Sequence, residues 1–127
     1  MKYGFSKKTV LSYEDAITKV TEELKKEGFG VLTTIDVQET MKKKLNLDVP
    51  KYVILGACNP PFAYEALRAE EELGLLLPCN LIVYEKEGKT NVAAFDPVVM
   101  TQIVENSAIL PIAQEMKARL ARVIAAV

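Results

Sequence analysis

The feature that most constrains the fold is the segment KYVILGAC at residues 51–58, which is apolar throughout after its lysine. Pro50 precedes it and Pro60 and Pro61 follow it, so the run has the length of one strand. A strand without polar alternation is typical of a strand covered on both faces. The segment therefore predicts a strand near the centre of a sheet.

The other segments alternate between strand and helix periodicity. Ser12 is a candidate N-cap for a helix whose apolar residues recur every three or four positions, and Gly28 supplies its stop. We expect strands at residues 3–10, 29–37, 51–58, 79–85 and 90–95, and helices at residues 13–27, 38–45, 61–73, 98–104 and 111–127. This order, β-α-β-α-β-α-β-β-α-α, predicts an α+β fold. Residues 1–127 would form a single compact domain, with a mixed or antiparallel sheet of about five strands covered by helices.

Charge and residue usage exclude several classes of function. The chain has 16 Lys and Arg against 17 Asp and Glu, which gives no field that would attract nucleic acid, and the charge runs at residues 42–44 and 70–72 are interpreted as solvated faces. Since no segment is apolar enough to span a membrane or to serve as a secretory leader, we expect a cytoplasmic protein with no nucleic-acid or membrane partner. The lack of histidine excludes Ser-His-Asp and Cys-His catalysis and His-ligated zinc or haem, and we expect no cofactor.

Two dipeptides carry the side chains best suited to chemistry. Cys58-Asn59 leaves the apolar strand and Cys79-Asn80 enters the next one, each beside a proline. An amide supplies two donors and one acceptor, and a thiol supplies a nucleophile or a soft ligand. Three interpretations are open: buried cysteines with asparagines in turn or cap hydrogen bonds, one shared polar site, or a redox or soft-metal site at the two thiols.

The connection between the dipeptides decides whether they can share a site. A helix over residues 61–73 carries the chain about 20 Å, and residues 74–78, if extended, carry it about 16 Å. These two displacements are nearly equal and can point in opposite directions. The second strand then starts beside the end of the first and runs antiparallel to it. A parallel crossover would instead separate the thiols by about 20 Å or more. We favour the antiparallel arrangement, which places Cys58 and Cys79 at the same end of the sheet with their neighbouring amides converging.

Several of these residues together form a pattern that resembles the domain of unknown function 302 family. The resemblance covers essentially the whole chain and is carried by IDV at residues 35–37, YVILGACNP at 52–60, AL at 66–67, Gly74, LLPCN at 76–80 and DP at 96–97. It implies a compact single α+β domain, found mainly in bacteria and archaea. The resemblance implies no agreed activity, and it assigns no catalytic or ligand residue to any position of this sequence.

We expect a non-enzymatic cytoplasmic domain that binds a small ligand or a protein partner at Cys58, Asn59, Cys79 and Asn80. The alternatives are a redox or transfer enzyme that uses a cysteine thiolate, and soft-metal binding through the two cysteines. We also expect a homodimer, since homodimers are the commonest oligomers. The leucines at residues 75–77 or the apolar end of the last helix could supply its interface.

Overall fold

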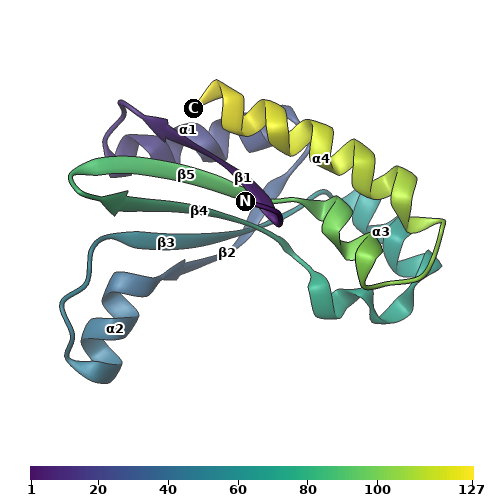
Figure 1. The fold of residues 1–127 in the computed structure, drawn as a ribbon, viewed down its shortest axis with the longest axis horizontal. Helices are drawn as coiled ribbons and strands as arrows, with labels where there is room; N and C mark the ends of the chain where they lie inside the picture. The colour runs from purple at the N-terminus through teal and green to yellow at the C-terminus, as the bar shows by residue number, and fades with distance from the viewer.

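Five strands form one antiparallel sheet in the computed structural model, which describes residues 1–127 (Figure 1). The strands are β1 (Gly4–Thr9), β2 (Gly30–Asp36), β3 (Tyr52–Cys58), β4 (Cys79–Lys86) and β5 (Lys89–Phe95). Their order is β1-β5-β4-β3-β2, and every neighbouring pair is antiparallel. The predicted α+β class, element order and late hairpin are confirmed. Glu87 and Gly88 both have positive φ, which matches the right-handed twist of the two strands that their turn joins.

Two long helices, α1 (Tyr13–Lys26) and α4 (Ile109–Ala126), cover one face of the sheet (Figure 1). Ser12 caps α1 as predicted, because its Oγ accepts a hydrogen bond from the backbone N–H of Asp15 at 3.1 Å. Leu24 of α1, Leu120 of α4 and Leu81 of β4 all belong to the main buried cluster. The apolar stripes of the two helices and the inward residues of the sheet therefore form one core.

A smaller apolar cluster lies beside the end of the sheet, where the chain forms α3 (Pro60–Ala69) and two 3₁₀ helices, η1 (Glu71–Leu76) and η2 (Pro97–Gln102). The helix predicted over residues 61–73 is wrong at its last four residues, because α3 ends at Ala69 and the backbone at Glu70 is extended. Asn106 stabilises this break, since its Nδ2 donates to the backbone oxygen of Ala69 at 2.8 Å and to Glu70 Oε1 at 3.1 Å. The segment predicted as a helix at residues 98–104 forms η2.

The helix α2 (Val37–Leu45) projects from the sheet on the side opposite α1 and α4 (Figure 1). Asp36 caps it by accepting from Glu39 N–H at 3.0 Å, but none of its residues is buried. No helix of the chain is long and apolar enough to cross a membrane.

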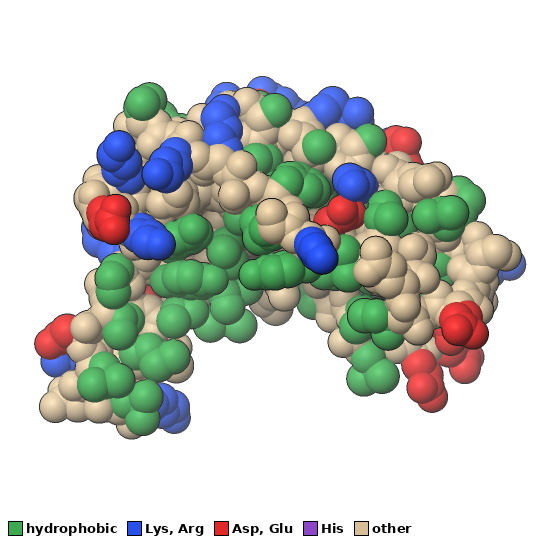
Figure 2. Space-filling model, in the orientation of Figure 1, with side chains coloured by type: hydrophobic (Ala, Val, Ile, Leu, Met, Phe, Trp, Pro, Cys, Tyr) green, Lys and Arg blue, Asp and Glu red, His purple; other side chains and the backbone are tan.

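The second face of the sheet has no helical layer over it. On β3, Val53 and Leu55 are buried against the core, whereas Tyr52 and Ile54, which point to the other face, are only half-buried. The strand at residues 51–58 does lie inside the sheet, between β4 and β2. The expectation that both of its faces are covered is wrong for this chain alone, because α1 and α4 lie on the same side. Figure 2 shows hydrophobic side chains gathered over the hollowed face between α2 and the α3 end.

Candidate functional site

The two cysteines lie at the same end of the sheet. Cys58 ends β3, Cys79 begins β4, and the antiparallel register places Cys79 opposite Ala57, the residue before Cys58. The antiparallel connection favoured from the sequence is therefore confirmed. Neither cysteine is in a disulfide.

Cys58 and Cys79 both line a pocket of about 280 Å³ at this end of the sheet. The pocket lies where the ends of β2, β3 and β4 meet α3, and Met116 of α4 closes it from the core side. Its lining is mainly hydrophobic, with Ala63 and Leu67 contributed by α3, and the hydroxyl of Thr33 is one of its few polar groups. No carboxylate, lysine or arginine lines it.

The two thiols have different environments. Cys79 is 1% exposed, and burial raises the pKa of its thiol to about 12, with a smaller contribution from the nearby Cys58. Cys58 is partly exposed at the strand end. Cys79 is therefore a neutral thiol at physiological pH, and Cys58 is the more accessible of the two.

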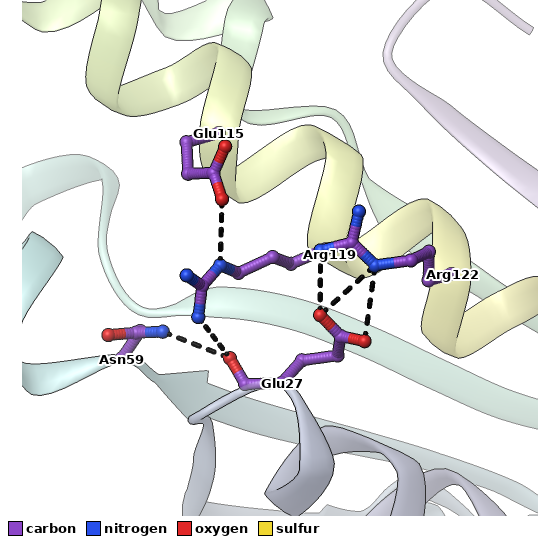
Figure 3. Close-up of polar contacts among 5 residues, drawn as sticks. All are labelled: Glu27, Asn59, Glu115, Arg119 and Arg122. Atoms are coloured by element: carbon purple, nitrogen blue, oxygen red, sulfur yellow. Dashed lines mark hydrogen bonds and ion pairs between the residues drawn. The ribbon is translucent and has the colours of Figure 1, made fainter.

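Asn59 has a structural role that its sequence position does not reveal. Its side chain is buried and its Nδ2 donates to the backbone oxygen of Glu27, just after α1, at 3.2 Å. Arg119 Nη1 of α4 donates to the same oxygen at 2.9 Å, while Arg119 Nε pairs with Glu115 at 3.0 Å (Figure 3). Arg122 pairs with the Glu27 carboxylate, its Nη2 lying 2.8 Å from Oε1. The amide thus ties the start of α3 to α1 and α4.

Asn80 does not join this group. It is exposed, and it lines the hollow on the open face of the sheet, while the preceding Cys79 points into the core. Consecutive residues of a strand point to opposite faces, so the two asparagine amides cannot converge. The structure brings together Cys58, Asn59 and Cys79 of the four predicted site residues and separates Asn80 from them.

The surfaces considered for a homodimer differ in availability. Leu75 is 85% exposed, but Leu76 and Leu77 pack partly against the smaller cluster. Leu120 and Val123 of α4 are buried in the main core. The apolar end of the last helix is therefore used within the chain and is not a free surface.

Comparison with known proteins identifies the family of this chain and a solved structure with the same fold. The family model described as "Domain of unknown function DUF302" matches residues 5–127. The crystal structure of an uncharacterized conserved DUF302 protein from Bacillus stearothermophilus superposes with a TM-score of 0.91 at 31% sequence identity, over 98% of each chain. No curated protein matches this chain.

Proposed function

Because this chain belongs to the DUF302 family, whose description names no activity, we propose from its own residues that it is a non-enzymatic domain that binds a small ligand. The ligand would occupy the pocket lined by Cys58, Asn59 and Cys79 and would be uncharged and largely apolar. Two free thiols in one pocket support the further proposal that the protein works in the reducing cytoplasm, where cysteines stay unpaired.

The composition of the pocket lining carries this proposal. Apart from the two thiols, no side chain in it can gain or lose a proton in the physiological range. General acid–base catalysis needs such a group within hydrogen-bond reach of the substrate, and activation of a thiol needs a neighbouring base or cation. A charged ligand would also find no counter-ion there. The lining therefore supports binding in preference to catalysis.

The volume of the pocket limits the size of the ligand. An apolar cavity of about 150 Å³ accepts benzene, and the pocket here has about 280 Å³. It has room for a molecule somewhat larger than benzene. Thr33 and the accessible thiol of Cys58 are the groups that could orient such a molecule, since the Asn59 amide is already bonded to Glu27.

Benzene is a suitable probe for the test. We expect its addition to shift methyl NMR signals of the pocket residues Leu67, Leu77 and Met116, and Ala63→Phe, which fills the pocket from α3, to weaken benzene binding at least about tenfold. Ala121→Phe makes the same change at an exposed position of α4 and should leave binding unchanged. No saturable shift in the wild-type protein would contradict the proposal.

A second candidate is binding of a soft metal ion such as Cu(I). The observation that favours it is a third sulfur, because Met116 lines the same pocket as Cys58 and Cys79. Thiolate and thioether ligands select Cu(I), and the metal would displace the proton from the buried thiol. Anaerobic titration with Cu(I) against a chromophoric chelator tests it. One equivalent should transfer to the wild type and none to Cys58→Ser, and retention of all copper by the chelator would exclude this candidate.

A further inference from the structure

An apolar hollow of about 520 Å³ lies on the open face of the sheet. It is lined mainly by hydrophobic side chains, and no charged side chain lines it. Tyr52 of β3 and Tyr84 of β4 stack there, with ring centroids 5.4 Å apart, beside Ile82 and Phe95. An antiparallel sheet with one solvated face normally presents polar residues on that face. The hollow on this face is instead lined mainly by aromatic and aliphatic side chains (Figure 2).

The projecting helix α2 extends this surface. The helix stands at one end of the open face (Figure 1). Leu45 at its end is 60% exposed, and Leu47 just after it is 51% exposed. Figure 2 shows hydrophobic side chains on the projecting segment around α2, next to those on the open face of the sheet. None of the residues of α2 is fully buried within the chain.

The open face of the sheet is large enough for a small specific interface. Five strands spaced about 4.8 Å apart and about 7 residues long at about 3.3 Å per residue present about 500 Å² on one face. Two copies packed face to face would together remove about 1,000 Å² of sheet surface from water, before α2 is added, which reaches the lower limit for specific protein interfaces. Sheets that pack face to face through interdigitated side chains are a common architecture.

The charges at the two ends of the open face are complementary. Lys42 and Lys43 pair with Asp48 and Glu39 within the chain, which leaves Lys44 as the unpaired basic residue at the end of α2. The exposed Glu71 and Glu72 begin η1 at the opposite end of the face. A twofold axis that lies in the interface and exchanges the two ends would bring the basic end of each copy to the acidic end of the other. Two identical chains can therefore satisfy both the apolar face and the charges at its ends.

We propose that a second copy of this chain covers the open sheet face, in a twofold homodimer in which α2 of each copy lies beside η1 of the other. This assembly goes beyond the ligand pocket and does not depend on it. It accounts for the uninterrupted apolar sequence of β3, whose outer face is left uncovered by the chain's own helices.

Sedimentation equilibrium of the full chain, from micromolar to submillimolar concentration, tests the proposal. We expect a dimer for the wild type. Leu47→Asp, on the segment after α2, should weaken the dimer at least about tenfold without altering the sheet. Leu110→Asp is the matched control, since Leu110 is also exposed but belongs to α4 on the other side of the sheet, and it should leave the dimer unchanged. A monomeric wild type, or a dimer indifferent to Leu47→Asp, would overturn the proposal.

Two further variants test the face and its orientation. Ile82→Lys places a charge in the hollow and should abolish the dimer while far-ultraviolet circular dichroism remains that of the folded chain. Lys44→Glu reverses the one lysine of this run that has no intrachain partner and should weaken the dimer, and simultaneous Glu71→Lys and Glu72→Lys should restore it. A dimer that survives Ile82→Lys, or a charge reversal with no effect or no rescue, would contradict the arrangement.

Discussion

Asn59 and Arg119 donate hydrogen bonds to the same acceptor, the backbone oxygen of Glu27, although the three residues lie on different segments of the chain (Figure 3). A helix leaves its last carbonyl groups without intrahelical partners, and a buried carbonyl that lacks a donor is costly. The two side chains satisfy this oxygen at the end of α1. Asn59, which follows Cys58 and also lines the pocket, is thereby tied to the end of α1.

Replacement of Asn59 therefore affects stability. We expect Asn59→Ala to lower the free energy of unfolding by about 1 kcal/mol, because one buried hydrogen bond is lost while Arg119 still satisfies Glu27. Gln114→Ala, which removes an amide side chain from an exposed position of α4, should change it by less than about 0.5 kcal/mol. Urea denaturation of both variants measures the difference, and equal effects would place the two amide side chains in equivalent environments, against the structure.

Gly28 is expected to be more sensitive to substitution than Gly88. Both have positive φ, at 85° and 75°, so an added side chain meets backbone strain of about 1 kcal/mol at either position. A Cβ at Gly28 would in addition lie 3.1 Å from Asn59 Nδ2, whereas one at Gly88 would have open space around it. Gly28→Ala should therefore destabilise the protein more than Gly88→Ala in thermal unfolding. The excess should shrink when Asn59 is also replaced by alanine.

The buried thiol predicts a dependence on alkaline pH. The pKa of Cys79 is about 12 in the folded protein, against an ordinary value of 9.0. Because folding favours the protonated thiol, its contribution to stability is complete below about pH 9 and is lost as the pH rises toward 12, at up to about 1.4 kcal/mol per pH unit. Denaturation at pH 8 and pH 10 should show a steeper loss for the wild type than for Cys79→Ala. Parallel losses in the two proteins would show that the thiol ionises freely.

The core of the protein depends on α4. Leu120 is fully buried against the sheet and α1, so Leu120→Ala should lower the free energy of unfolding by about 2 to 5 kcal/mol. Val10→Ala, at a fully exposed apolar side chain, should have an effect below about 0.5 kcal/mol. The thermal midpoints of the two variants provide the comparison. A small effect at Leu120 would mean that the apolar stripe of α4 does not pack as the structure shows.

Local patterns were sufficient to predict the order of the elements. The hairpin turn at Glu87 and Gly88, the N-cap at Ser12 and the antiparallel return to Cys79 depend on short stretches of chain, whose geometry is set by turn chemistry and element length. The break at Glu70 was not predictable in this way. It is stabilised by Asn106, 36 residues away, and contacts over such separations leave no periodic signal.

The candidate site was predicted in part for a related reason. Strand geometry placed the two thiols together, but the partner of Asn59 lies on α1, and residue spacing alone cannot identify it. The apolar run of β3 likewise indicates that both faces avoid water, without specifying which element covers each one. In this chain the helices cover only one of them.

The strand order has a consequence for biosynthesis. β1 is an edge strand whose only partner is β5. The backbone groups of Phe5 can therefore pair only after Ala94, which lies opposite it, has been synthesised. During translation the first strand must therefore remain unpaired while most of the domain emerges from the ribosome. The pairing of β1 with β5 that completes the sheet forms late. Any nascent chain that stops before β5 would present unpaired β-strand edges to its neighbours, which makes prematurely terminated products of this protein substrates for chaperones and proteases.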